Sequence, residues 1–136
     1  MPASDAETGA PEFPEGTPLA VTAEVLYLVN LLLLPGLAFA VLLLLYRKHR
    51  HSGPALARCH LRQTVAGSVW AGVLLVLVNG IILALGGYHA AGTWVILVLY
   101  FTTCHACLVL LGVLGLSKAM AGQQYRYPLL GRPCDV

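Results

Sequence analysis

The sequence predicts an all-α integral membrane protein, a bundle of three transmembrane helices. Of its 136 residues, 58% are hydrophobic and only 10% are charged, whereas about 25% of the residues in soluble domains are charged. No Lys, Arg, Asp or Glu interrupts three apolar segments at about 25–46, 64–85 and 94–116. Each segment is close to the ~20 residues that a helix needs to cross a bilayer. This composition excludes disorder for most of the chain, and a net charge of only +2 disfavours nucleic-acid binding.

The three predicted spans carry residues that shape helices and their packing. Pro35 and Gly36 lie midway along the first span, where proline removes a backbone hydrogen bond and predicts a kink. Small residues on the second and third spans allow close approach of helices. These predicted packing residues are Gly67, Ser68, Ala71, Gly72, Gly112 and Gly115. We expect them to pack the three helices together, with an interface between copies as the alternative.

The distribution of charge predicts the orientation of the helices. Basic residues are concentrated between the first two spans and after the third, so both regions are expected in the cytoplasm and the N-terminus outside. This divides the chain into an acidic, proline-rich outer tail at 1–18, a membrane domain at 19–132 and a short cytoplasmic C-terminal segment at 117–136. The first loop either only determines topology or also binds lipid headgroups. Its basic residues are Arg47, Lys48, Arg50, Arg58 and Arg62.

Hydrogen-bonding side chains within the spans form one predicted layer in the outer half of the membrane. They are Asn30, Asn79, Thr102 and Thr103. Polar groups at this depth are costly and therefore indicate function, here a polar pocket for a quinone headgroup, a substrate or a proton. The alternative is that they join the helices by hydrogen bonds worth about 1 kcal/mol each.

The third span also contains a histidine between two cysteines. His105 lies near the predicted midplane, where it is a candidate ligand for a haem shared with a partner subunit, or for a quinone. Cys104 and Cys107 share a helix face from which His105 is turned away, so they act either as small apolar residues or as a redox pair. No metal site is predicted. Cys59 and Cys134 are expected in the cytoplasm as reduced thiols, without a disulfide.

No catalytic motif is present in the sequence. It contains no phosphate-binding loop, no His-Glu-x-x-His and no Gly-x-Ser-x-Gly. Five of the six acidic residues lie at or before Glu24, and the sixth is Asp135. Paired carboxylates within the membrane are therefore not expected, and we predict no catalytic residue and no enzymatic activity.

The order of these features resembles a known family. LLLLPGLAFAVLLLLYRKHR precedes a helix that opens with CHLRQTVAGSVW, and the third span ends with GVLGLSKAMAGQQYRYPLL. Over roughly residues 20–132 this resembles a bacterial family of small, uncharacterised inner-membrane proteins with three to four spans, which is distantly similar to the Tic-type import channel component of chloroplasts. The residues that carry the resemblance are Gln63, Lys118, Gly122, Tyr125, Arg126, Tyr127 and Pro128. At 60–63 the chain departs from the family's Asn-aromatic-Gln run, and only Gln63 matches there.

The resemblance implies a multi-pass protein of the bacterial inner membrane and supplies no established enzymatic activity. The small size, the lack of a catalytic constellation and the acidic, proline-rich tail predict a non-enzymatic accessory or structural subunit of a larger inner-membrane complex. The partners are then the lipid bilayer and other membrane subunits, and no cofactor is needed. One alternative is a small oligomeric channel or translocation component with a path lined by Asn30, Asn79 and His105. The other is an electron-transfer subunit that binds haem or quinone through His105.

Overall fold

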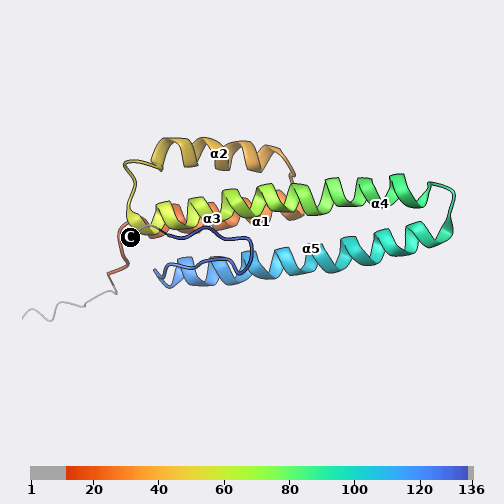
Figure 1. Ribbon diagram of the computed structural model, residues 1–136. Helices are drawn as coiled ribbons and strands as arrows, with labels where there is room; N and C mark the ends of the chain where they lie inside the picture. The colour runs from red at the N-terminus through yellow and green to blue at the C-terminus, as the bar shows by residue number, and fades with distance from the viewer. Residues whose placement is uncertain (1–11, 135–136) are drawn as a thin grey trace, which may run out of the picture.

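The computed structural model describes residues 12–134, and within this range the chain forms helices and no strands (Figure 1). An all-α fold is therefore confirmed. The elements follow one another as α1 (Thr17–Leu32), α2 (Leu37–His49), α3 (Ala55–Gly72), the π-helical turn η1 (Val73–Leu77), α4 (Val78–Gly86) and α5 (Ala91–Met120). Most of the predicted outer tail, 1–11, lies outside the described residues.

The longest elements of the structure are two helical rods. α3, η1 and α4 run without interruption over Ala55–Gly86, and α5 returns antiparallel to them after a short turn (Figure 1). Both rods are long and apolar enough to cross a membrane, and they contain the predicted spans 64–85 and 94–116. Within the most apolar 18-residue window of each rod few residues are buried, so the apolar side chains there form the outer surface of the protein.

The predicted first span, 25–46, is not a single transmembrane helix, and this part of the prediction is wrong. The chain ends α1 at Leu32, reverses, and begins α2 at Leu37. The two helices lie side by side as a hairpin, and both pack against α3 (Figure 1). At 1.5 Å per residue, the 16 residues of α1 extend only about 24 Å, so the hairpin turns back before it reaches the far ends of the long rods.

The reversal has a local cause at Pro35-Gly36. Proline lacks the N–H that would continue the helix, and Gly36 adopts a φ of 88°, which is strained for any side chain with a Cβ. The amide group of Asn30 stabilises the turn, because its Oδ1 accepts a hydrogen bond of 2.9 Å from the Gly36 N–H. The sequence predicts a kink at this proline, and the structure has a complete turn.

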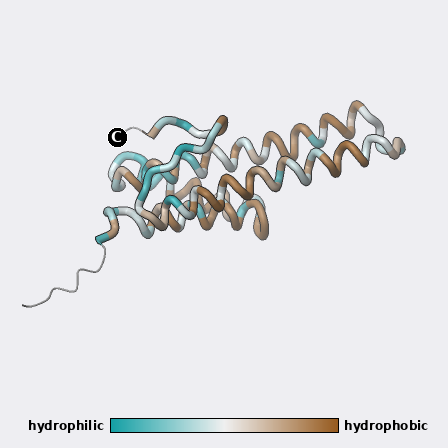
Figure 2. Tube along the Cα trace, turned by 90° about the horizontal axis from the view of Figure 1, so that it is seen from below, coloured by the Kyte–Doolittle hydropathy of each residue, from teal (hydrophilic) through white to brown (hydrophobic). Residues whose placement is uncertain are grey.

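The hairpin also determines at which end of the bundle the start of α1 lies. A Cβ on Gly16 would lie 2.7 Å from Pro54, and one on Gly122 would lie 2.6 Å from Pro14. The start of α1, the basic loop and the C-terminal residues therefore lie together, at the end where hydrophilic residues gather in Figure 2. In the described part of the chain, the start of α1 and the C-terminal residues thus lie at the same end of the bundle, whereas three consecutive spans would place them at opposite ends.

The centre of the bundle is α1, which packs against α2, α3 and α5. Alanines on α1 are completely buried: Ala20 packs with Leu56 and Ala119, and Ala23 packs with Leu42 and Leu61. Beyond the hairpin tip only α4 and the first half of α5 remain, and α4 contacts α5 and η1. The structure thus has a packed bundle at one end and two antiparallel helices at the other.

Candidate functional site

A buried carboxylate–imidazole pair lies inside the packed end of the bundle. Glu24 is on α1 and His60 is on α3, and neither has any solvent-exposed surface. The imidazole Nδ1 lies 2.6 Å from the carboxylate Oε1. Two ionisable groups this close share a proton and form a pair with no net charge, which lowers the large free-energy penalty for burying either one alone.

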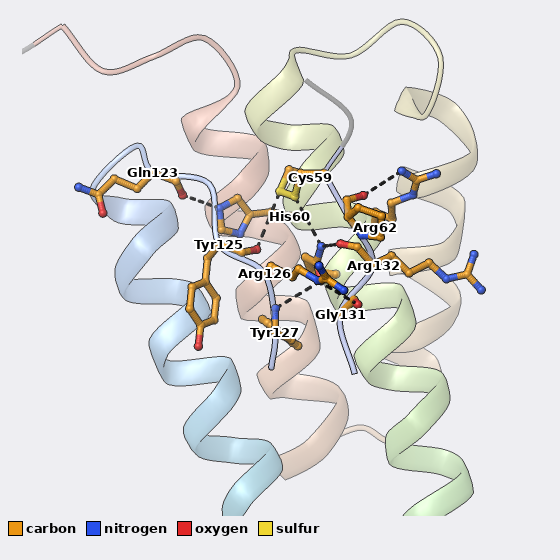
Figure 3. The surroundings of a disulfide bond; sticks show 12 residues. Cys59, His60, Arg62, Gln123, Tyr125, Arg126, Tyr127, Gly131 and Arg132 are labelled. Atoms are coloured by element: carbon orange, nitrogen blue, oxygen red, sulfur yellow. Dashed lines mark hydrogen bonds between the residues drawn. A yellow bond between two sulfur atoms is a disulfide. The ribbon is translucent and has the colours of Figure 1, made fainter. Parts of the chain in front are cut away.

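The segment that follows α5 supplies the remaining partners of this pair. We call this segment, residues 121–134, the strap. The backbone carbonyl of Gln123 accepts a hydrogen bond of 2.9 Å from His60 Nε2 (Figure 3), and the Tyr127 hydroxyl donates to the second carboxylate oxygen of Glu24. Because a carbonyl can only accept, Nε2 carries a hydrogen. Burial raises the pKa of Tyr127, and the neighbouring Glu24 carboxylate raises it further, so the phenol stays protonated and remains a donor.

Glycines on α3 and α5 provide the room for these large side chains. A Cβ on Gly115 would lie 2.5–2.8 Å from the carboxylate of Glu24, and one on Gly112 would lie 2.7 Å from the ring of Tyr27. On α3, a Cβ on Gly67 would lie 3.0 Å from Tyr127. These predicted packing glycines therefore face side chains of α1 and the strap, within one chain.

The strap is tied to α3 by side-chain contacts and a disulfide (Figure 3). Gln63 donates to the carbonyl of Arg132, and Arg62 donates to the carbonyl of Pro133 at 3.1 Å. Cys59 and Cys134 form a disulfide across 75 residues of sequence. The expectation of two reduced thiols is therefore wrong, because the strap folds back along α3 and brings the two Cα atoms to 5.0 Å. A crosslink of this span typically contributes about 2–4 kcal/mol.

This polar cluster is closed, and its geometry is suited to holding the fold. The oxygens of Glu24 and the nitrogens of His60 have partners within the chain. With no exposed surface on either residue, a substrate does not reach them while the strap is in place. Its physical effect is to join α1, α3 and the strap by hydrogen bonds that are strong in a low-dielectric interior.

A second feature is a pocket of about 480 Å³ at the tip of the hairpin. We call it the mid-bundle pocket. Asn30, Pro35 and Phe39 line it from the hairpin, Ser68 and Leu75 from the long rod, and Phe101 and His105 from α5. Among the described residues, neither the Ser68 hydroxyl nor His105 Nδ1 has a hydrogen-bond partner, although both atoms are buried. The rings of Phe101 and His105 stack, with centroids 5.5 Å apart.

The predicted polar layer is only partly assembled. Asn30 and His105 line the same pocket, but Thr102 and Thr103 are exposed on α5. Asn79 donates a hydrogen bond of 2.7 Å to the carbonyl of Leu75 in the π-helical turn of its own rod. The two asparagines thus satisfy backbone groups close to them in sequence, and the structure does not join these four residues into one site.

The other predicted residues fall into distinct places. Cys104 and Cys107 are free thiols, the first partly buried and the second exposed. In the part of the chain that the structure describes, no three His, Cys, Asp or Glu side chains are grouped as a metal site requires. Gly72 has nothing close to its Cβ position, whereas Ser68 and Ala71 are buried. All three line the mid-bundle pocket.

The residues that carry the family resemblance lie on or beside the strap. Tyr127 reaches the buried pair, and its backbone N–H lies 3.4 Å from Gln63 Oε1. Lys118 donates to the side chain of Gln123 at 3.2 Å, and Gly122 has a φ of 66° where the strap begins. The rest of this set forms the middle of the strap, at Tyr125, Arg126 and Pro128.

Glu24 and His60 are not among the site residues that the sequence predicts. The signal for Glu24 was present, since it is a single carboxylate within the apolar run TAEVLYLVN. An ionisable residue in such a run indicates a buried partner. Glu24 falls in the predicted membrane domain at 19–132, but the predicted first span begins one residue after it, at about 25. His60 could not be recognised as its partner because 36 residues separate them.

No protein-family model matches this chain, and no curated protein or solved structure matches it. Fold and site together define an all-α protein with two helical rods long and apolar enough to cross a membrane, a helical hairpin packed against them, and a buried carboxylate–imidazole pair.

Proposed function

We propose that this protein is a non-enzymatic accessory subunit of the bacterial inner membrane whose mid-bundle pocket binds an apolar molecule with a hydrogen-bonding ring headgroup, of the quinone class. One observation carries the proposal. Nδ1 of His105 is buried without a hydrogen-bond partner among the described residues, and the imidazole lines a pocket whose other walls are mostly apolar. Ligand pockets combine such walls with a few polar groups that orient the ligand.

The shape and chemistry of the pocket support a ring headgroup. Its volume of about 480 Å³ lies within the 300–1,000 Å³ typical of small-molecule sites. Phe39 and Phe101 offer faces for stacking, while the hydroxyl of Ser68 and the imidazole of His105 can donate to a carbonyl oxygen. The π-helical turn at Val73–Leu77 forms part of the wall, and turns of this kind occur frequently at functional sites.

Titration with a short-chain quinone tests this proposal. We expect purified protein in detergent to bind decylubiquinone, and His105→Ala to weaken binding about tenfold, since one lost hydrogen bond of about 1.4 kcal/mol corresponds to that factor. Ser68→Ala is expected to weaken it less, because the hydroxyl is a neutral donor. Isothermal titration calorimetry measures both affinities.

Thr103→Ala provides the matched control, because Thr103 is on the same helix, is exposed and does not line the pocket. Its affinity for decylubiquinone is expected to equal that of the unmodified protein. Absence of binding by the unmodified protein, or equal affinities of the His105→Ala and Thr103→Ala variants, would refute the quinone proposal.

The proposed membrane placement rests on the surface of the long rods. Large apolar side chains are exposed along both, including Val76 at 72%, Leu85 at 85% and Leu99 at 64%. Water does not tolerate an apolar surface of this extent, whereas lipid does. Positive charge favours the cytoplasm for the basic end, and a persistent disulfide at that end favours an oxidising compartment.

Thiol labelling in intact cells tests this placement. In a background with Cys104→Ala and Cys107→Ala, we expect single cysteines introduced by Glu15→Cys and Arg126→Cys to react with a membrane-impermeant maleimide from the same side. A third, introduced by His89→Cys in the turn between α4 and α5, is expected to react from the opposite side. Labelling of the Glu15→Cys and Arg126→Cys variants from opposite sides would restore a three-span topology. The side from which the Glu15→Cys and Arg126→Cys variants react also shows where the basic end lies. Positive charge favours the cytoplasm for this end, and the disulfide favours an oxidising compartment.

A further inference from the structure

The disulfide between Cys59 and Cys134 is reachable from the surface of the protein. Cys134 is partly exposed, and both cysteines line a pocket of about 300 Å³ between α2 and α3. Arg50 and His51, which line the same pocket, are exposed, so the pocket opens to solvent. In thiol–disulfide exchange, an attacking thiolate must reach one of the two sulfur atoms. The position of this disulfide meets that requirement.

The disulfide is one of two covalent attachments of the strap. At its start the strap continues from α5 after Met120, and at its end Cys134 is joined to Cys59 on α3. A segment that is fixed at both ends has few conformations, so it stays close to the residues beneath it. Reduction of the disulfide removes the second attachment and leaves the strap anchored at α5.

The noncovalent contacts of the strap are few. Among residues 121–134, only Tyr127 is buried. Near the disulfide, side chains of α3 donate hydrogen bonds to the carbonyls of Arg132 and Pro133, and both of these residues are exposed, so water competes for the carbonyls. Segments with few buried contacts open locally at a low cost in free energy. Once the crosslink is broken, the burial of Tyr127 and a small number of hydrogen bonds hold the strap.

The strap directly covers the buried carboxylate–imidazole pair. The Gln123 carbonyl accepts the hydrogen bond from His60 Nε2, and the Tyr127 hydroxyl donates to Glu24. Cys59 immediately precedes His60 on α3, so the crosslink fastens the strap beside the pair that it covers (Figure 3). Departure of the strap would remove one hydrogen-bond partner from each member of the pair and would admit solvent to both.

We propose that the Cys59–Cys134 disulfide is a site of thiol–disulfide exchange with a dithiol, and that its reduction releases the strap from the buried pair. A thiolate of the dithiol attacks the sulfur of Cys134, the more exposed of the two, and Cys59 leaves as a thiolate. The second thiol of the dithiol then displaces Cys134. The two protons that the dithiol loses to water are balanced by the two that the cysteine thiolates take up, and the dithiol ends as a disulfide. This site shares no residue with the proposed quinone pocket.

Alkylation of thiols in the folded protein tests the exchange. In the full-length Cys104→Ala/Cys107→Ala variant in detergent, Cys59 and Cys134 are the remaining cysteines. We expect dithiothreitol, a dithiol, to release both as thiols without denaturant, and mass spectrometry to detect two iodoacetamide adducts. If the adducts appear only after the protein has been denatured, the exchange site is wrong.

Modification of histidine by diethyl pyrocarbonate tests the release of the strap. After reduction, alkylation and removal of the reductant, we expect His60 to react at least about tenfold faster than in the oxidised protein, because the Gln123 carbonyl no longer occupies its Nε2. His89 is exposed in the turn between α4 and α5, and it is expected to react equally in both forms. Mass spectrometry of proteolytic peptides measures both rates.

Cys134→Ala, in the same background, is the matched control, because it frees the end of the strap without reductant or an adduct on Cys59. We expect His60 in this variant to react as fast as in the reduced protein, whether or not dithiothreitol has been added. The helical circular dichroism signal is expected to stay unchanged, since the strap contains no helix. Equal protection of His60 in Cys134→Ala and in the oxidised protein would overturn the release. A loss of the helical signal on reduction would also overturn it, because general unfolding would then expose His60.

Discussion

Glu24→Ala is expected to lower the free energy of unfolding by about 3–5 kcal/mol, the usual loss when one partner of a buried ion pair is removed. The substitution removes the acceptor that faces His60 Nδ1 and the acceptor of the Tyr127 hydroxyl at the same time. Both donors then remain in an interior without solvent contact. Denaturant titration in detergent, followed by circular dichroism, measures the loss.

Glu24→Gln separates the effect of the charge of Glu24 from that of its shape, and a double-mutant cycle tests its pairing with His60. Glu24→Gln keeps the shape of the side chain, and its amide N–H can donate to Nδ1 of a neutral imidazole while its oxygen accepts from Tyr127, so mainly the charge is lost. We therefore expect a smaller loss of about 1–3 kcal/mol for this variant. In a double-mutant cycle, Glu24→Ala and His60→Ala are expected to couple by at least about 1 kcal/mol. Additive effects in the cycle would show that the two side chains are not partners.

Gly115→Ala is expected to destabilise the protein by about 1–3 kcal/mol, in spite of the better helix propensity of alanine. The added methyl group would lie 2.5–2.8 Å from three atoms of the Glu24 carboxyl group. That group cannot move aside, because His60 and Tyr127 hold it from two directions. α5 would have to move away from α1, and unfolding by denaturant would report the lost packing.

Gly72 and Gly80 supply matched controls for Gly115. Both are helical glycines with nothing within 4 Å of the Cβ position. Alanine at either position is expected to be neutral or stabilising by up to about 1 kcal/mol, since it restricts the unfolded chain and meets no neighbour. If Gly115→Ala behaved like Gly72→Ala, the close approach of α5 to Glu24 would be contradicted.

Part of the candidate site was visible in the sequence. Gly67, Gly112 and Gly115 stood out as small residues on apolar helices, and the structure places each against a side chain of α1 or the strap. His105 was selected as a polar residue in an apolar helix, and it lines the mid-bundle pocket. These residues were recognisable because each is unusual for its immediate surroundings.

The contacts across the bundle were not visible. Glu24 and Tyr127 are 103 residues apart, and Cys59 and Cys134 are 75 residues apart. Local periodicity relates residues within a few turns of one helix, and it does not indicate which distant segments will meet. The expectation of reduced cysteines failed for this reason, and the partners of Glu24 were not predicted for the same reason.

The sequence by itself determined the all-α class, the two long apolar rods and the position of a break at Pro35-Gly36, because uninterrupted apolar runs and a proline act on the chain locally. Only the tertiary structure decided that this break is a complete reversal. At one end of the bundle, α1 presents the buried carboxylate of Glu24 to His60 and Tyr127, and no local pattern in the sequence relates these three residues. Hydrogen bonding to one buried carboxylate thus joins α1, α3 and the strap, because a buried acceptor must find its donors wherever the fold brings them.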